Sequence, residues 1–432
     1  MHNSMKCTFT ALLLTAVLSV QAQTVVLNLE NEYVERYMTE VTYSSSADES
    51  RVADYLPADG AVRSDLPQVF YVDVPELFQS YIDNGTLKIL LSTDATFPDS
   101  TTVSMTVTQL HYPLHILLPG KHYYYRVMLR SILAGLGDVE TLGQVRMISV
   151  PSVRNVRDMG GWPTADGRRV RYGMIYRSGE LNGQHVADSA DLSVLRQIGI
   201  GAELDMRARW EEEHDVSAFG FLPANAVPAG EVPSFLYTND SGQLPEHLTQ
   251  FIYQYRWRQE FQFIVRNLRA GRAVLQHCVN GADRTGYLSL LLEGLLGVTY
   301  DGLIKDYELT TFNRHIKTKA HADLIIDYIQ TLDGATLQQR FRTFWLRKVG
   351  VSSADIDYFI DAMLEGEPQD NTTTAIAGVS CASPQDYGPS RYAAGCFDVS
   401  GRRISTVGGS RSAAPRMVLE RQSDGTVKKL LR

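Results

Sequence analysis

The stretch that most constrains the fold is the decapeptide His277-Cys278-Val279-Asn280-Gly281-Ala282-Asp283-Arg284-Thr285-Gly286. It follows the apolar residues 273–276 and precedes a long apolar segment that begins at Tyr287. Two apolar runs separated by a short polar loop with glycine are typical of a buried strand, a tight turn and a buried helix. We therefore predict a strand, an anion-binding loop and a helix, with the loop at the helix N-terminus.

The residue types in this loop favour phosphoryl chemistry. Loop amides that turn inward form a nest for a tetrahedral anion, and the helix N-terminus adds positive potential. The residues predicted to bind phosphate in this way are Val279, Asn280, Gly281, Ala282 and Arg284. The same field favours the thiolate of Cys278, which is the nucleophilic form. Arg284 offers two phosphate oxygens a planar fork of donors. The Thr285 hydroxyl either donates to the thiolate or caps the helix.

Cys-x5-Arg followed by Thr-Gly resembles the signature of the cysteine-dependent protein tyrosine and dual-specificity phosphatases. The pattern His-Cys-x-x-Gly-x-Asp-Arg-Thr-Gly is similar to a bacterial branch of that family that has a secreted mycobacterial member. Other pieces resemble the same branch in the family's order: residues 155–161, 166–170 and 175–178, and then the strand and Asp-x-Arg of residues 203–207. The resemblance covers residues 150 to 365 and leaves both ends of the chain unexplained.

The resemblance implies a phosphomonoesterase without metal or cofactor, most simply a protein-tyrosine phosphatase. In its mechanism Cys278 attacks phosphorus and water hydrolyses the phosphocysteine, so the implied partner is a phosphorylated protein or a small phosphomonoester. Two residues are candidates for the general acid. Asp283 lies inside the loop, and Asp240 lies where a mobile acid loop falls in other tyrosine phosphatases. Asp283 is favoured because its place in the loop guarantees reach to the substrate.

Four further residues are candidates for supporting roles. His277 either orients the loop or is a satisfied core histidine. Asp205 and Arg207 follow a buried strand, where they line the site or form a structural ion pair. Arg157 either extends the pocket or ties the N-terminal segment of this domain to its body.

Several alternatives stay open. Some relatives carry a lysine before Asp-Arg for polyanionic substrates, whereas this chain has Ala282, which favours phosphotyrosine over a phosphoinositide. Inositol polyphosphates remain possible because Arg157, Arg177 or Arg207 can supply the missing charge. A scaffold protein that binds phosphate without turnover is another alternative. A sulfurtransferase does not need Asp-Arg-Thr-Gly, and no second cysteine or close histidine pair has the spacing of a zinc site.

The order of expected elements predicts a multidomain chain of 432 residues. Residues 1–22 resemble a secretory signal peptide, which implies a periplasmic, secreted or cell-surface protein without a membrane span. Residues 24–148 show short alternating strands and predict an all-β sandwich. Residues 150–366 alternate strands and helices and predict an α/β catalytic domain with a mostly parallel sheet flanked by helices. Residues 367–432 predict a linker and a small β appendage.

The ends of the chain suggest functions of their own. The segment 117–127 resembles a late strand of fibronectin type III or immunoglobulin-like modules, and its tyrosines form either ordinary strand positions or a surface for a protein or glycan partner. The tail resembles those of exported Bacteroidetes proteins, some of which are sorting domains. Cys381 and Cys396 are candidates for a disulfide that leaves Cys278 free. The net charge of −8 and the pI of 5.7 argue against a nucleic-acid-binding surface.

Overall fold

The computed structural model describes residues 24–58, 66–208, 216–226, 234–238, 245–313 and 315–369, and four short strands between residues 396 and 431. The chain divides into two compact units, Met1–Gln369 and Asp370–Arg432. The proposed signal peptide, Asp240 and Cys381 lie outside the described residues. The predictions made for them therefore remain predictions.

The six-stranded sheet of the first unit carries the loop that contains Cys278. Its strands lie in the order β12-β13-β11-β14-β10-β8, and every neighbouring pair is parallel except β8 with β10. This confirms the predicted mostly parallel sheet. The strands are β8 (Arg157–Asp158), β10 (Ile175–Ser178), β11 (Ile200–Asp205), β12 (Leu222–Pro223), β13 (Ser234–Tyr237) and β14 (Ala273–His277), and β9 (Arg169–Val170) pairs separately with β15 (Leu364–Glu365).

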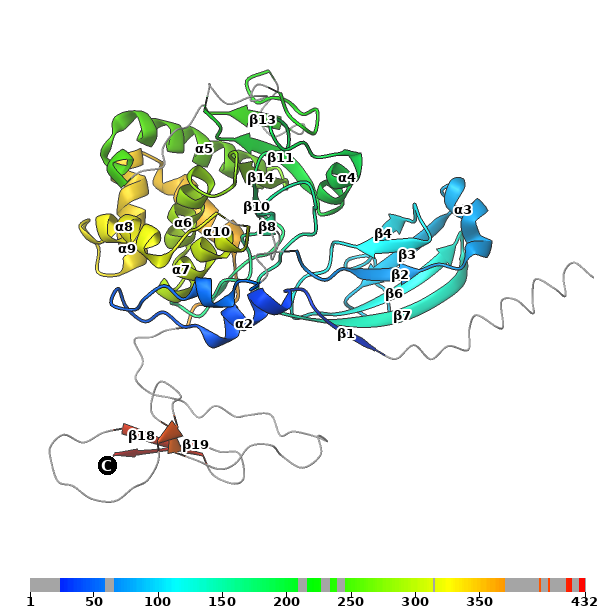
Figure 1. Cartoon of the computed structure of the whole chain (residues 1–432), viewed down its shortest axis with the longest axis horizontal. Coiled ribbons are helices and arrows are strands. Elements are labelled where there is room, and N and C mark those ends of the chain that lie inside the picture. Colours follow the sequence, from blue (N-terminus) through cyan, green and yellow to red (C-terminus); the bar gives the residue numbers. More distant parts are fainter. Residues whose placement is uncertain are drawn as a thin grey trace, which may run out of the picture. The chain divides into compact units, whose positions relative to one another are not determined.

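Helices cover both faces of this sheet. Along β14, Val274 packs in one hydrophobic cluster and Leu275 in another, because successive side chains of a strand point to opposite faces. In Figure 1, α4 lies across the sheet from α5 and α6. The helices are α4 (Ser189–Gln197), η3 (Pro245–Thr249), α5 (Phe251–Arg269), α6 (Arg284–Leu296), α7 (Tyr300–Leu309), η4 (Thr310–Asn313), α8 (Lys319–Gln330), α9 (Leu337–Thr343), η5 (Phe344–Val349) and α10 (Ser353–Met363).

Local sequence signals set the ends of these helices. Asp188 caps α4 in a capping box with Asp191, and Gly199 follows the helix with a φ of +92°. All thirteen residues of α6 are buried, as its apolar sequence required. A helix enclosed on every side cannot shift without disturbing the core, so the loop at its N-terminus has a rigid base.

The N-terminal strands form two sheets that share one core. A five-stranded sheet has the order β1-β7-β6-β3-β4, and a two-stranded sheet pairs β2 with β5. Side chains from both sheets meet in one hydrophobic cluster that includes Val72, Leu114 and Val127. The strands are β1 (Val25–Asn28), β2 (Phe70–Asp73), β3 (Leu87–Ser92), β4 (Val103–Thr106), β5 (His111–Leu114), β6 (His122–Leu129) and β7 (Ile132–Leu142).

The structure does not clearly show the predicted all-β sandwich. This region contains the helices α2 (Glu32–Glu40), η1 (Val52–Tyr55), η2 (Glu76–Phe78) and α3 (Gln79–Asp83). Moreover, the buried side chains of α2 and η1 pack in the hydrophobic cluster of the α/β domain, not in that of the N-terminal sheets. The sequence of α2 has only a short amphipathic pattern, and the hydroxyl of its Tyr37 bonds Glu308, which is 271 positions away.

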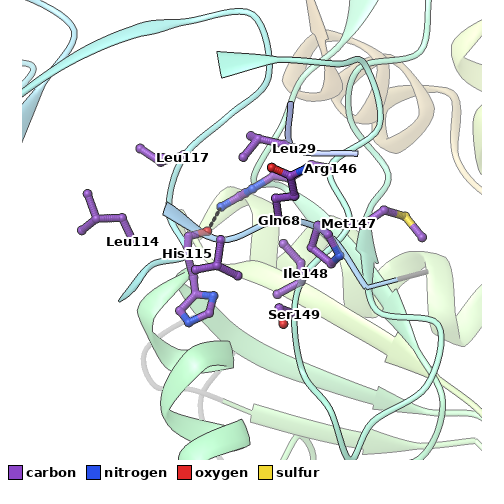
Figure 2. A pocket seen from close by; sticks show the side chains of 11 residues that line it. Leu29, Gln68, Leu114, His115, Leu117, Arg146, Met147, Ile148 and Ser149 are labelled. Atoms are coloured by element: carbon purple, nitrogen blue, oxygen red, sulfur yellow. Dashed lines mark hydrogen bonds between the residues drawn. The ribbon is translucent and has the colours of Figure 1, made fainter. Parts of the chain in front are cut away.

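A small cavity lies where the N-terminal sheets meet the α/β domain (Figure 2). Arg146 borders it and donates to the carbonyl of His115 (3.0 Å), the hydroxyl of Tyr176 (2.9 Å) and the carboxylate of Asp158 (3.1 Å). Burial, together with the charge of Arg146, lowers the pKa of His115 to about 4, so this histidine is neutral at pH 7. The cavity volume of about 20 Å³ holds about one water molecule and no substrate.

The second unit contains a four-stranded sheet in the order β17-β16-β18-β19. Its strands are β16 (Cys396–Phe397), β17 (Arg403–Ile404), β18 (Met417–Arg421) and β19 (Val427–Leu431), paired antiparallel throughout. A small β structure follows the α/β domain, as the sequence indicated. Among the helices that the structure describes, none combines the length and the apolar character needed to cross a bilayer.

Candidate active site

Cys278 lies at the carboxyl edge of the parallel sheet. It follows His277, the last residue of β14, which pairs on one side with Ser178 at the end of β10 and on the other with Asp205 at the end of β11. Ligands of open α/β sheets bind at this edge because the strand ends and the helix N-termini meet there. The Cys278 side chain is buried and forms no disulfide.

The loop between β14 and α6 needs glycine at position 281. Gly281 has a φ of +65°, and a Cβ atom there would lie 2.4 Å from the carbonyl oxygen of Ser178. The carbonyl of Gly281 accepts hydrogen bonds from the side chains of Asn155 (2.7 Å) and Arg177 (2.9 Å). The carbonyl of Val279 accepts the amide of Glu180 (2.9 Å).

These contacts orient the amides of the loop. No cis peptide bond is present in the described residues, and in a trans peptide the C=O and the following N–H point in opposite directions. The carbonyls of Val279 and Gly281 turn outward to their donors, so the amides of Asn280 and Ala282 face the concave side. The loop therefore has the inward amides that an anion nest needs.

Arg284 and Thr285 stand in the first turn of α6, directly after the loop. Both side chains are buried, and Nη1 of Arg284 donates to the carbonyl of Met206 (3.1 Å) just beyond β11. The Thr285 hydroxyl is buried and has no hydrogen-bond partner within the described part of the chain. Burying a hydroxyl without a hydrogen-bond partner costs free energy. Thr285 lies at the start of α6, seven residues after Cys278. The structure thus places Cys278, the loop and Arg284 at the junction between the end of β14 and the start of α6.

Two arginines behind the loop share one buried carboxylate. Asp306 on α7 accepts Nε of Arg157 (2.9 Å) and Nη1 of Arg177 (2.6 Å), and all three side chains are at most 1% exposed. Burial alone would raise the pKa of Asp306, but the two guanidinium groups outweigh it and hold this pKa below its ordinary value. Burial lowers the pKa of Arg177 to about 10, which leaves it charged at pH 7.

This network supports the loop and occupies all three guanidinium nitrogens of Arg157, which donate to Asn155 and Asp306. Arg177 and Asn155 both hold the carbonyl of Gly281. Of the two roles considered for Arg157, the contacts therefore favour the structural one.

Glu293 on α6 adds a second buried carboxyl to this network. Neither of its oxygens has a hydrogen-bond partner of ordinary geometry in the described residues. Burial and the neighbouring charge of Asp306 raise its pKa well above the ordinary value, against the attraction of Arg177 and Arg157. This raised pKa favours the protonated form of the Glu293 carboxyl.

Glu293→Gln is expected to stabilise the protein as the pH rises. A carboxyl whose pKa is raised on folding contributes its full stability below the unfolded pKa of 4.5 and loses it as the pH rises toward the folded pKa. Glutamine resembles the protonated acid and does not titrate, so the variant should gain on the wild type between pH 4 and pH 8. Melting temperatures across this range test the prediction, and a constant difference would contradict it.

His277 lies behind the loop in a fully buried polar cluster. Its Nε2 is 3.1 Å from Oε1 of Glu203, and its Nδ1 is 3.9 Å from Oδ1 of Asp205. The other oxygen of Glu203, Oε2, accepts the hydroxyl of Ser217. Asp205 in turn accepts the amide and the guanidinium of Arg207, whose Nη1 also pairs with Glu180 (3.3 Å). These contacts join β11, β14 and the strand end after β10. The contacts favour a structural ion pair for Asp205 and Arg207 and a buried, hydrogen-bonded position for His277.

Asp283 closes the loop and contacts Lys317, a residue that the sequence analysis did not select. Nζ of Lys317 donates to Oδ1 of Asp283, whose side chain keeps 32% of its surface exposed. Thr311 Oγ1 holds the backbone of Lys317 through its amide (2.9 Å) and its carbonyl (2.7 Å). The only sequence signal for Lys317 was a basic run after α7, because its distance of 34 residues from Asp283 gives no local pattern.

No group of three or more histidine, cysteine, aspartate or glutamate side chains suited to a metal ion occurs within the described ranges. The groups at the site include a thiol, backbone amides, guanidinium groups, carboxyls and an ammonium group. Such groups are suited to binding and attacking a phosphate ester.

Comparison with known proteins agrees with this arrangement. The model of the tyrosine phosphatase family matches residues 148–365, just over half of the chain. A Cupriavidus necator protein provisionally named as a tyrosine-protein phosphatase is 31% identical over 170 residues, which are 37% of this chain and 61% of that protein. The triple specificity protein phosphatase PtpB of Mycobacterium tuberculosis is 28% identical over 191 residues, 37% of this chain and 67% of that protein.

The chain thus spans 61% and 67% of the lengths of these two relatives. The matched residues include both ends of the six-stranded sheet, the loop from Cys278 to Asp283 and all helices from α4 to α10. The chain belongs to the tyrosine phosphatase family.

Proposed function

We propose that this protein is a phosphomonoesterase, most simply a protein-tyrosine phosphatase, that acts through a phosphocysteine intermediate. The observation that carries the proposal is the loop itself. Cys278 stands at its base, outward carbonyls at Val279 and Gly281 turn amides inward, and Arg284 is held in the first turn of α6. We infer that phosphate binds between these groups.

In the proposed first step the Sγ of the Cys278 thiolate attacks phosphorus in line. The S–P bond forms as the bond to the leaving oxygen breaks, and the leaving oxygen takes a proton from a general acid. Negative charge on the three equatorial oxygens is stabilised by the loop amides and by the fork of Arg284. Water then attacks the phosphocysteine and gives a proton to the carboxylate of the former general acid. The S–P bond breaks, and phosphate leaves with the thiolate and the acid restored. We infer that the Thr285 hydroxyl, which has no hydrogen-bond partner in the described residues, turns to donate to the departing sulfur.

Asp283 is the proposed general acid, with Asp240 as the alternative. Asp283 is partly exposed at the end of the loop, and Lys317 holds its carboxylate. The acid must leave or share this contact when it protonates a leaving group, so Lys317 acts on the position of Asp283. This role for Lys317 is compatible with a second one, which is to provide positive charge in place of the lysine that some relatives have at position 282.

Steady-state hydrolysis in the presence of EDTA tests the proposal. Wild type should hydrolyse an aryl phosphate and a phosphotyrosine peptide. Asp283→Asn should lose about 10²- to 10⁴-fold in rate on substrates with poor leaving groups and little on those with good ones, since general acid catalysis contributes on this scale. The matched variant Asp240→Asn should match the wild type on both. A loss in Asp240→Asn on substrates with poor leaving groups, with wild-type rates in Asp283→Asn, would assign the general acid to Asp240. No turnover by wild type on either substrate would reject the phosphatase proposal.

The specificity beyond phosphotyrosine is a separate part of the proposal. The name of the mycobacterial relative states triple specificity for that protein. For this chain, dual specificity and activity on inositol polyphosphates or phosphoinositides are alternatives of the same mechanism. A phosphate-binding scaffold is a further alternative, and it predicts that wild type binds vanadate without turning over any ester.

The flanking regions complete the proposal. We propose export through the signal peptide of residues 1–22 and a place in the periplasm or at the cell surface. We also propose an immunoglobulin-like or fibronectin-like role for the N-terminal sheets in binding a protein or glycan. N-terminal sequencing of the protein from its native host tests export, with a mature start after Ala22 as the expected result and a start at residue 1 or 5 as the contrary one.

A further inference from the structure

A segment that precedes the residues matched by the family packs inside the α/β domain. We call residues 30–55, which contain α2 and η1, the N-terminal strap. Its buried side chains Val34, Tyr37, Val41, Tyr43, Val52 and Tyr55 belong to the same hydrophobic cluster as those of α6 and α7. Figure 1 draws α2 beside α7. The strap is therefore part of the domain that contains Cys278, although the chain returns to that domain only about 90 residues later, near Ile148.

The strap supplies the hydrogen bonds of a buried carboxylate on α7. Glu308 is fully buried, and its Oε2 accepts the hydroxyls of both Tyr37 and Tyr43 (2.6 Å each). Its Oε1 accepts the hydroxyl of Ser50 (2.5 Å) and the amide of Lys319 (2.6 Å). Three of these four donors come from the strap. A buried carboxylate is tolerated only when its oxygens have such partners, so Glu308 depends on the strap.

Three more contacts fasten the strap to the same part of the domain. Nζ of Lys319 donates to the carbonyl of Ser46 (2.9 Å), and Nζ of Lys305 donates to the carbonyl of Met38 (3.2 Å). The amide of Tyr43 donates to Asp301 (2.7 Å). Both ends of α7 and the first residue of α8 are thus bound by the strap.

The segment fixed by Glu308 also holds the catalytic loop. Lys319 begins α8, and Lys317 lies two residues before it and contacts Asp283. In the other direction, α7 continues into η4, where Asn313 accepts the amide of Asn155 (2.9 Å). Asn155 in turn holds the carbonyl of Gly281. Glu308 therefore links the strap to two contacts that hold the loop, Lys317 with Asp283 and Asn155 with Gly281.

We propose that the N-terminal strap positions the catalytic loop through Glu308, with Tyr37 and Tyr43 as positioning residues. Their hydroxyls fix the start of α8 and thereby place Lys317 against Asp283. The proposal rests on the proposed function for its kinetic readout. Its structural readout does not depend on that function.

The test compares Tyr37→Phe/Tyr43→Phe with wild type and with Tyr55→Phe, all in the full chain. Tyr55→Phe is a matched control because its hydroxyl bonds Glu40 within the strap (3.2 Å) and does not contact Glu308. Hydrogen exchange of the segments 310–321 and 278–286 is measured together with hydrolysis of aryl phosphates that have good and poor leaving groups.

We expect faster exchange in both segments of the double variant and wild-type exchange there in Tyr55→Phe. We expect kcat on the poor leaving group to fall by about tenfold to a hundredfold, the cost of a small misplacement of a catalytic group, with a smaller loss on the good one. Adding Lys317→Met should then lower the rate less than it does in the wild type, because residues in one network are not additive.

Faster exchange of the strap with unchanged exchange at 278–286 and 310–321, or equal losses on both substrates, would overturn the proposal. If the double variant does not fold, Ser50→Ala removes a single donor from Glu308, and the same measurements apply to it. A wild type without turnover rejects the proposed function alone, because the exchange data still show whether the strap controls the loop.

Discussion

Cys278→Ser is expected to abolish hydrolysis of every phosphate ester while phosphate binding survives. A serine hydroxyl in place of the thiol removes the ionised nucleophile, and the loss of a covalent nucleophile lowers turnover by at least about 10⁴-fold. The loop amides and Arg284 do not depend on the sulfur for their positions, because Asn155, Arg177, Glu180 and Met206 hold them.

The measurement pairs initial rates with binding of phosphate or vanadate. Arg284→Lys is the informative companion, since it keeps the charge but loses the planar fork and should weaken both binding and turnover. Mass spectrometry of wild type quenched during turnover should detect a phosphorylated Cys278. Residual hydrolysis by Cys278→Ser above a hundredth of the wild-type rate would contradict the covalent mechanism.

Asp306→Asn is expected to cost about 3 kcal/mol of unfolding free energy at pH 7, since removing one partner of a buried ion pair leaves an uncompensated charge. Two charged guanidinium groups, Arg157 and Arg177, would then face a neutral side chain in a site where all three residues are at most 1% exposed. Because the same arginines support Gly281 and Asn155, activity should fall with stability.

The matched control is Asp357→Asn, which makes the same change in a surface pair with Arg342 (2.7 Å). It should cost less than about 1 kcal/mol, as surface pairs do. Urea unfolding at pH 7 measures both variants. Equal effects of the two substitutions would show that the buried network does not stabilise the fold.

The pH dependence of Asp306→Asn has a defined sign. The folded pKa of Asp306 lies below its ordinary value of 3.8, so its contribution is complete above that pH and is lost as the pH falls through the folded pKa. The difference from the wild type should therefore be largest near neutrality. Glu293 is a second buried carboxyl that interacts with both arginines, and its ionisation can supply a replacement anion. Asp306→Asn/Glu293→Gln should therefore be less stable than Asp306→Asn alone.

Part of the candidate site was predictable because it is local in sequence. Cys278, the loop residues, Arg284 and Thr285 fall within eight consecutive positions, and the strand and helix on either side follow from apolar runs of suitable length. Gly281 was predictable as a turn residue. The structure adds two physical reasons, which are its φ of +65° and the carbonyl of Ser178, which leaves no room for a Cβ atom. The order of strands and helices likewise predicted the α/β domain.

Other parts of the site depend on contacts between distant residues. Arg157 and Asp306 are 149 positions apart, and Tyr37 and Glu308 are 271 apart. No periodicity or motif pairs such residues, so sequence reasoning left Arg157 with two roles and did not consider Glu308 or Lys317. The short polar segment around α2 was assigned to the β region for the same reason, since its apolar positions are too few to indicate which core they join.

The sequence by itself determined the chemistry offered at the loop and the fold class of the domain that carries it, because both depend on neighbouring residues and on short-range backbone preference. Only the tertiary structure decided which buried charges hold the loop, that Lys317 meets Asp283, and that the N-terminal strap completes the core around Glu308. The physical reason is that burial makes each polar group require a partner, and the chain supplies that partner from wherever folding brings it close.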